Sequence, residues 1–161
     1  MCIRDRLGAE RVILMSRHAD RTVLGRTFGA TDVVAERGEE GIAAVRELTG
    51  GRGVPFVVEA VGTPESWAMA LGMARAGGHV GAVGVPHTMP DLPLFPIVRS
   101  HLTVGAGIAP VRRYLPDLVE RVTSGRLDPG PVFDLTLPLE QVAEGYAAMD
   151  ERRSIKTMLA G

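Results

Sequence analysis

The feature that most constrains the fold of this chain is an alternation of short apolar segments and helical segments over its first two thirds. Arg11–Met15 and Pro55–Val61 are short and rich in β-branched residues, which is typical of buried parallel strands. Glu39–Thr49 instead repeats apolar residues at every third position, which is typical of one helix face. Strands are predicted at residues 11–15, 31–35, 55–61, 79–85 and 102–106, and helices at residues 16–28, 39–49 and 63–76.

Turn and capping residues mark the ends of these segments. Gly29 follows the first helix as a C-cap, and the glycines at 50–53 break the second. Thr63 and Pro64 start the third helix as a capping residue followed by a proline in the first turn. Because strands and helices alternate, the predicted fold class is α/β, with a doubly wound parallel sheet covered by helices on both faces.

The last third of the chain has a different pattern. Residues 112–124 carry an apolar stripe and predict a helix that ends at Gly125. A strand is expected at 132–137, a short helix at 139–149 and a closing strand at 154–159, whereas the proline-rich residues 86–96 are expected to form a loop.

Composition excludes several classes of function. The formal net charge is -1, so no basic excess points to nucleic acid or to an anionic membrane surface. No apolar run approaches the ~20 residues that a membrane-spanning helix needs. Cys2 is the only cysteine, which excludes an internal disulfide and a cysteine-based structural zinc site and indicates a reduced, cytoplasmic location.

The first six residues are interpreted separately from the rest. Residues 1–6 lack the apolar core of a signal peptide and fit poorly onto the segment that follows. We expect them to be a non-native leader.

Several short motifs, taken in order, carry a family resemblance. Each is weak alone, but their order and spacing from Leu7 to Gly161 resemble the medium-chain zinc-dependent alcohol dehydrogenases. The motifs are Phe28-Gly-Ala-Thr-Asp32, Val57-Val-Glu-Ala-Val-Gly62, Gly77-Gly-His-Val-Gly-Ala-Val-Gly-Val-Pro86, Gly105-Ala-Gly107 and Arg153-Ser-Ile-Lys-Thr-Met-Leu159.

This resemblance implies a two-domain oxidoreductase. One domain of such an enzyme holds a catalytic zinc through cysteine and histidine, and the other is a Rossmann fold that binds a nicotinamide dinucleotide. A hydride then passes between the cofactor and a small alcohol, aldehyde or ketone. Members of the family commonly form homo-oligomers at full length.

The chain departs from the family pattern at its start. The strand end that discriminates between cofactors normally lies ~20 residues after the Gly-x-Gly-x-x-Gly turn, but here that end is Ser16, and counting back ~20 residues passes Met1. We therefore expect a partial Rossmann domain at residues 7–107 that lacks its first strand, and a segment at 108–161 that returns to the catalytic domain. Zinc is expected only in the missing N-terminal region. The fragment alone is expected to be inactive, and either poorly soluble or a weak binder of NADP.

The residues that follow the first strand predict a preference for NADP, with NAD as the alternative. An NAD site usually ends this strand with a carboxylate that accepts hydrogen bonds from the ribose 2′-OH. Here Ser16 stands at that end, followed by Arg17, His18 and Arg21, and guanidinium groups favour phosphate. The competing interpretation is a basic surface at an exposed helix start, partly neutralised by Asp20.

Further cofactor contacts are expected at the carboxyl ends of the strands, where ligands bind in open α/β folds. A glycine after the third strand lets the backbone approach the nicotinamide ribose, although a tight turn explains it equally well. By resemblance, main-chain groups after the next strand meet the nicotinamide carboxamide, and the residues one strand further on occupy the matching position in the crevice. Lys156 reaches the pyrophosphate unless it is a solvated lysine on an edge strand. The full set is Val61, Gly62, Gly84, Val85, Gly107, Ile108 and Lys156.

Two questions about function stay open at this point. Glu59 lies in an apolar strand, and we interpret it as a hydrogen-bonded carboxylate that orders the sheet rather than as a general base. A zinc-free quinone or enoyl reductase of the same superfamily fits the glycine pattern as well. A nucleotide-binding module without catalysis is the alternative outside the enzymes.

Overall fold

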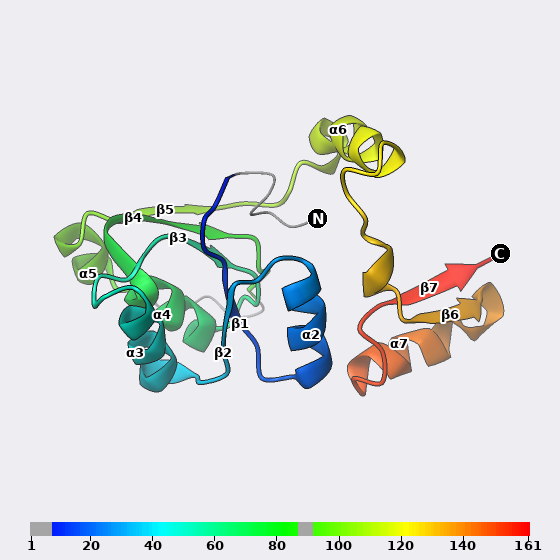
Figure 1. The fold of residues 1–161 in the computed structure, drawn as a ribbon, viewed down its shortest axis with the longest axis horizontal. Helices are drawn as coiled ribbons and strands as arrows, with labels where there is room; N and C mark the ends of the chain where they lie inside the picture. Colours follow the sequence, from blue (N-terminus) through cyan, green and yellow to red (C-terminus); the bar gives the residue numbers. More distant parts are fainter. Residues whose placement is uncertain (1–7, 87–91) are drawn as a thin grey trace. The chain divides into compact units, whose positions relative to one another are not determined.

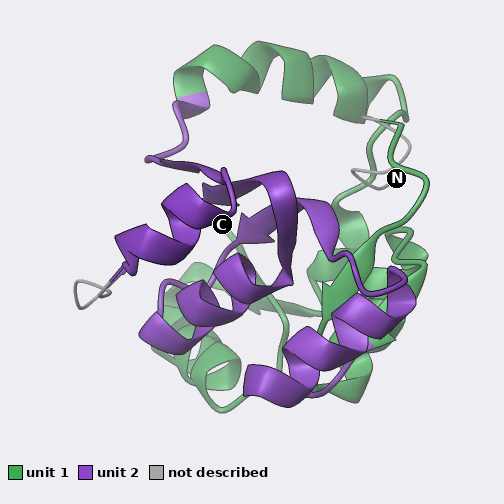
Figure 2. Ribbon diagram, turned by 90° about the vertical axis from the view of Figure 1, so that its left-hand side faces the viewer, with its two compact units in different colours: residues 1–33, 112–161 green, residues 34–111 purple. Residues whose placement is uncertain are grey.

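The computed structural model describes residues 8–86 and 92–161, so residues 1–6, interpreted above as a leader, lie outside the described part. The chain divides into two compact units, which we call the sheet unit (residues 34–111) and the flanking unit (residues up to 33 together with 112–161) (Figure 2). Each unit has its own secondary structure and is described by itself.

The sheet unit is built on three parallel strands in the order β3–β4–β5: β3 (Val54–Glu59), β4 (Ala74–Ala82) and β5 (Thr103–Ala106) (Figure 1). Helix α4 (Pro64–Met73) packs on this sheet, and α3 (Gly38–Leu48) packs on α4. Trp67 and Ala70 of α4 join Val80 and Ala82 of β4 in one buried cluster. Burial of this apolar surface is the main stabilising contribution in the unit.

Helix α4 begins where its capping sequence predicts. The Thr63 hydroxyl accepts a hydrogen bond from the backbone N–H of Ser66 at 3.2 Å, and the Ser66 hydroxyl accepts one from the N–H of Thr63 at 3.0 Å. This reciprocal capping box satisfies two backbone donors that the first turn leaves without a helical acceptor.

The flanking unit contains two small sheets. In the first, β1 (Ile13–Met15) pairs with β2 (Asp32–Val34), and α2 (Ala19–Thr27) connects them. In the second, β6 (Leu135–Pro138) and β7 (Thr157–Ala160) are parallel and α7 (Val142–Asp150) packs on them. Gly145 of α7 lies against β7, where an added Cβ would sit 3.1 Å from the Thr157 side chain.

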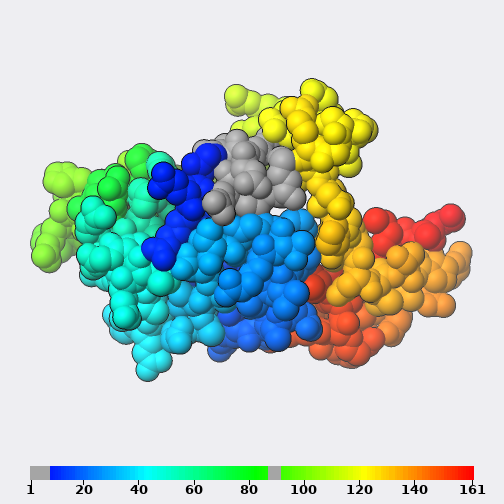
Figure 3. Space-filling view, in the orientation of Figure 1, coloured from blue at the N-terminus to red at the C-terminus, as the bar shows by residue number. Residues whose placement is uncertain are grey.

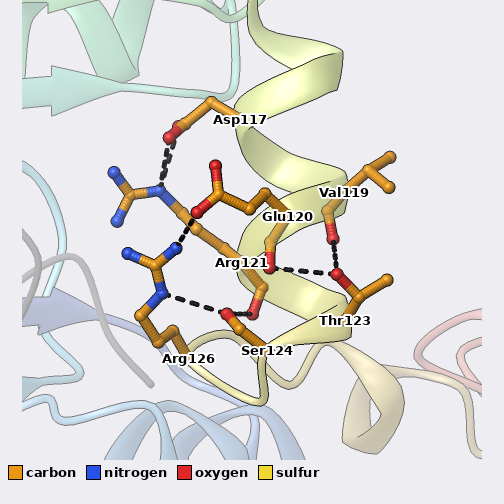
Figure 4. A network of polar contacts seen from close by, with 7 residues as sticks. All are labelled: Asp117, Val119, Glu120, Arg121, Thr123, Ser124 and Arg126. Atoms are coloured by element: carbon orange, nitrogen blue, oxygen red, sulfur yellow. Dashed lines mark hydrogen bonds and ion pairs between the residues drawn. The ribbon is translucent and has the colours of Figure 1, made fainter.

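Helix α6 (Val111–Thr123) carries apolar side chains that are largely exposed within the described residues, among them Leu115 and Val119. Two ion pairs lie along its C-terminal half: Asp117 pairs with Arg121, and Glu120 pairs with Arg126 beyond the helix end (Figure 4). The space-filling view shows this helix, in yellow, at the surface (Figure 3).

Several predicted boundaries were wrong. The first helix begins at Ala19 rather than at 16, the strand expected at 79–85 ends at Ala82, and the closing strand begins at Thr157 rather than at 154. The predicted third helix ends at Met73 rather than at 76, because β4 already begins at Ala74 and bulges before it resumes pairing at His79. Gly77, with φ +70, makes this bulge possible. Because a Gly-Gly pair can either end a helix or form a bulge, the sequence alone did not distinguish the two.

Of the loop expected at residues 86–96, residues 87–91 lie outside the described part, and α5 (Leu94–Arg99) already begins within its last residues. The strand expected at 132–137 begins only at Leu135, after the 3-10 turn η1 (Gly130–Val132).

The predicted α/β class is confirmed. Strands and helices alternate, and the strand pairs β3–β4, β4–β5 and β6–β7 are parallel. In a doubly wound sheet of order 3-2-1-4-5-6 the first strand lies between the second and the fourth. Within the described residues no strand joins β2–β1 to β3–β4–β5, so the two sheets stay separate.

Candidate functional site

The segment between β1 and α2 turns sharply at Ser16. Its hydroxyl lies 3.4 Å from both the backbone N and the carbonyl O of His18, and the residue is 8% exposed. This local side-chain bond stabilises a turn instead of a continued strand, so that α2 begins at Ala19. Ser16 therefore shapes the turn from inside, while Arg17 and Arg21 stay exposed.

A surface hollow of about 200 Å³ lies at the start of α2, and we call it the arginine hollow. It brings residues of α2 together with residues that follow α7 in the same unit. Arg152 Nη1 lies 3.1 Å from His18 Nε2, which closes one side. The lining residues are Arg17, His18, Ala19, Asp20, Arg21, Arg152, Ser154 and Ile155.

The charges in the arginine hollow are unbalanced. Three lining residues are arginines and one, Asp20, is acidic. Across the described chain, none of the guanidinium groups of Arg17, Arg21 and Arg152 lies within ion-pair distance of a carboxylate. The first turn of α2 adds backbone N–H groups that point out of the helix start. This charge and these backbone donors suit an anion.

Asp134 holds the C-terminal side of the hollow in place. Its Oδ1 accepts hydrogen bonds from the Ser154 hydroxyl at 2.6 Å and from the backbone N–H of Ile155 at 2.9 Å. The first of these bonds, followed by the second, lowers the pKa of the Asp134 carboxyl. Lys156 also donates its backbone N–H to Asp134 at 3.3 Å, but its side chain is outside the lining of the hollow.

A second group of predicted residues meets at the carboxyl ends of β3 and β4: Glu59, Val61, Gly62, Gly84 and Val85, which we call the glycine junction. Glu59 is 3% exposed. Its Oε1 accepts from Val61 N at 2.7 Å, from Gly62 N at 2.9 Å and from the Ser66 hydroxyl at 2.7 Å. These bonds confirm the interpretation of Glu59 as a buried carboxylate that orders the sheet.

The environment of Glu59 keeps it ionised. Burial raises the pKa of the Glu59 carboxyl, but the hydrogen bonds from Gly62, Ser66 and Val61 outweigh burial and leave the pKa below its ordinary value. Within the described residues Oε2 of Glu59 has no hydrogen-bond partner. The free-energy cost of this buried, unsatisfied oxygen offsets part of the stabilisation that the hydrogen bonds to Oε1 provide.

The backbone of Glu59 ties the second half of the glycine junction to the first. Its carbonyl accepts from Val83 N at 2.8 Å and from Gly84 N at 3.2 Å. A Cβ at Gly62, whose φ is +86, would lie 2.5 Å from the Val85 carbonyl O, and a Cβ at Gly84 would lie 2.5 Å from Gly62 N. Both positions therefore need glycine for the fold itself, whatever binds there.

The remaining predicted residues follow β5. Gly107 donates its N–H to the Ala82 carbonyl at 3.4 Å, and Ile108 is 92% exposed. An added Cβ at Gly107 would meet no atom within 4 Å, so packing does not demand glycine there.

Sequence analysis missed Arg152 and Asp134. Arg152 lies 134 positions from His18 in the sequence, and only the fold brings the two side chains together. The available signal was weak: a basic residue stands directly after a predicted helix end, where glycine is common. Nothing in the sequence pointed to Asp134, because a carboxylate directly before a strand is common.

Two further findings concern metals and membranes. In residues 8–86 and 92–161 no three His, Cys, Asp or Glu side chains come together as ligands for a metal ion, and none of these residues is assigned to zinc. The helices in this same part of the chain all fall short of the length and hydropathy needed to cross a bilayer.

Comparison with known proteins agrees with this geometry. The model of the zinc-binding dehydrogenase family matches residues 3–124. A probable zinc-binding alcohol dehydrogenase of Mycobacterium tuberculosis is 38% identical over 146 residues, 90% of this chain and 37% of its own length. An L-threonine 3-dehydrogenase of Bacillus velezensis is 30% identical over 157 residues, 94% of this chain and 44% of its own length.

A solved structure shares the fold as well. An alcohol dehydrogenase from Thermus sp. ATN1 superposes with a TM-score of 0.90 and 32% identity, over 98% of this chain and 47% of that protein. The chain thus spans less than half the length of each of these three relatives.

The class defined by the fold is that of α/β proteins with a Rossmann-like parallel sheet. Within that class, the chain belongs to the zinc-binding dehydrogenase family. The resemblance stated from the sequence motifs to the C-terminal part of these proteins is confirmed.

Proposed function

We propose that this chain is the cofactor-binding part of an oxidoreductase that transfers a hydride between NADP and a small alcohol, aldehyde or ketone. When bound, the nicotinamide ring of NADP supplies the hydride chemistry. The chain's own residues bind and orient the cofactor. We expect the chain alone to be inactive toward such substrates.

The observation that carries the preference for NADP is the arginine hollow. Its three guanidinium groups have no carboxylate partner in the described chain, and the residue directly after strand β1 is Ser16 rather than an acidic residue. The 2′-phosphate of NADP carries close to two negative charges and three acceptor oxygens. Guanidinium groups bind such a phosphate through charge-assisted and often bidentate hydrogen bonds.

The other predicted contacts complete the proposal. Gly62, Gly84 and Val85 of the glycine junction present close-packed backbone to the nicotinamide end of the cofactor, with Val61 beside them. Gly107 and Ile108 extend that surface beyond β5. Lys156 contributes a positive charge toward the pyrophosphate. Support for the roles of the glycine junction, Gly107 and Ile108 comes from their place after the carboxyl ends of parallel strands. Lys156 instead precedes β7, and its role rests on the family resemblance.

The test changes the two residues after β1 and measures whether the preference for NADPH over NADH changes. In the 161-residue chain, Ser16→Asp combined with Arg17→Ile removes one guanidinium and adds a carboxylate able to accept from a ribose 2′-OH. The ratio of Kd for NADPH to Kd for NADH should rise by about tenfold or more, the effect of one lost charge-assisted hydrogen bond. Chemical-shift titration measures both Kd values even in the millimolar range.

The matched control is Arg26→Ile, which removes an exposed arginine from the last turn of α2, outside the lining of the hollow. Arg17→Ile alone serves as the second variant, because Ser16 is buried and its replacement by Asp can perturb the fold. An unchanged NADPH-to-NADH ratio in folded Arg17→Ile, equal to that of the control, contradicts the proposal.

A further inference from the structure

Arg152 adopts a backbone conformation that its residue type disfavours. Its φ is +61, and in the described chain His101 is the only other non-glycine residue with positive φ. For an L-residue with a side chain, this left-handed region costs about 1–2 kcal/mol, whereas glycine enters it freely. A strained residue at such a position calls for a reason outside the local backbone.

The local structure around Arg152 is a helix ending that suits glycine. Arg152 donates its N–H to the Met149 carbonyl at 3.2 Å, and Arg153 donates to the Ala148 carbonyl at 2.8 Å. Together these bonds close the C-terminus of α7 in the manner that usually places glycine in the left-handed position. The backbone thus needs no side chain at residue 152.

The side chain of Arg152 is committed to the arginine hollow. Its Nη1 lies 3.1 Å from His18 Nε2, and it lines the hollow together with Arg17 and Arg21. The adjacent residue differs: Arg153 pairs with Glu144 at 2.9 Å and with Glu151 at 2.7 Å, so its charge is neutralised. Of these two neighbouring arginines, only Arg152 offers an uncompensated charge to the hollow.

We propose that Arg152 is a specificity-determining residue for NADP, whose guanidinium binds the 2′-phosphate from the C-terminal side while Arg17 and Arg21 bind it from α2. This inference rests on the function proposed above and names a residue of the same site. The inference explains why arginine occupies a position that favours glycine. The cost of the backbone strain is offset by the binding energy that a third cation contributes at the hollow.

Replacing Arg152 separates the two effects. In the 161-residue chain, Arg152→Gly removes both the strain and the cation, so the urea midpoint of unfolding should stay unchanged or rise. The Kd for NADPH should increase about tenfold, as expected for one charge-assisted hydrogen bond, while the Kd for NADH changes less than twofold. A residue with a purely structural role cannot raise stability and lower affinity for one cofactor only.

Two further variants complete the design. Asparagine tolerates the left-handed conformation and carries no charge, so Arg152→Asn should reproduce the loss of NADPH affinity. This variant keeps the inference testable if the glycine variant does not fold. Arg153→Ala removes the neighbouring, neutralised charge and should change the Kd for NADPH less than twofold.

The outcomes distinguish this inference from the proposed function. If Arg17→Ile lowers the NADPH preference but Arg152→Gly and Arg152→Asn do not, Arg152 is no specificity residue and the proposed function stands. If the Arg152 variants weaken NADPH and NADH equally, the guanidinium acts on a group common to both cofactors and the inference is overturned. If neither Arg17 nor Arg152 affects the ratio, both proposals fail.

Discussion

The glycine junction of the sheet unit and the arginine hollow of the flanking unit are built by opposite means. In the glycine junction, one carboxylate that is 3% exposed gathers backbone N–H groups, and two glycines leave no room for a Cβ. In the arginine hollow, exposed guanidinium groups surround an open space and have no carboxylate partners within the described chain. The first region is specified by close packing, and the second by charge.

This difference separates stability from selectivity. Residues of the glycine junction hold their own fold, so their replacement costs free energy of unfolding before any ligand is considered. The exposed arginines of the hollow contribute little to the fold, since exposed charges rarely stabilise it, and are therefore free to select a ligand. Substitutions that affect both regions alike would remove the distinction.

The largest effect is expected at Gly62. Gly62→Ala places a Cβ 2.5 Å from the Val85 carbonyl in a residue with φ +86, which forces the junction apart. We expect the free energy of unfolding to fall by about 2–4 kcal/mol, measured by urea denaturation. Gly105→Ala in β5 is the control, because its Cβ would meet nothing within 4 Å. Equal losses in the two variants would contradict the idea that packing specifies the junction.

The sequence predicted the glycine junction better than the arginine hollow, for a physical reason. Strand ends and capping residues are local signals, so the cap at Thr63 was predicted correctly, and the strand before Gly62 was predicted to within two residues of its end at Glu59. The bulge in β4 was not predicted, because its glycines fit a helix end as well as a bulge. Arg152 was missed because its contact with His18 depends on tertiary structure.

The next effect concerns Glu59. Glu59→Ala leaves Val61 N, Gly62 N and the Ser66 hydroxyl without their acceptor, so we expect a loss of about 2–3 kcal/mol at pH 7. Glu59→Gln keeps an acceptor oxygen and should recover part of that loss. A loss in Glu59→Ala no larger than in the exposed variant Glu65→Ala would show that the carboxylate does not hold the junction.

The same carboxylate predicts a pH dependence. The hydrogen bonds that outweigh burial hold the pKa of Glu59 below its ordinary value of 4.5, so its contribution to stability is fully present above that value. The contribution is lost as the pH falls through the lower pKa of the folded state. Asp32 and Asp134 also have lowered pKa values, so the measured quantity is the difference between the wild type and Glu59→Gln at each pH. That difference should shrink from pH 6 to pH 3, and a constant difference contradicts the assignment.

The smallest effect is expected just beyond the end of α6, where Arg126 is exposed like the arginines of the hollow but has an acidic partner. Arg126 pairs with Glu120, and Arg121 lies 2.9 Å from Asp117 (Figure 4). Exposed pairs of this kind often contribute nothing measurable, so Arg126→Ala should leave the urea midpoint unchanged. It should also leave the Kd for NADPH unchanged, because a neutralised guanidinium attracts no further anion. If Arg126→Ala weakened NADPH binding as much as Arg152→Gly does, the total number of cationic side chains, rather than the geometry of the hollow, would control affinity.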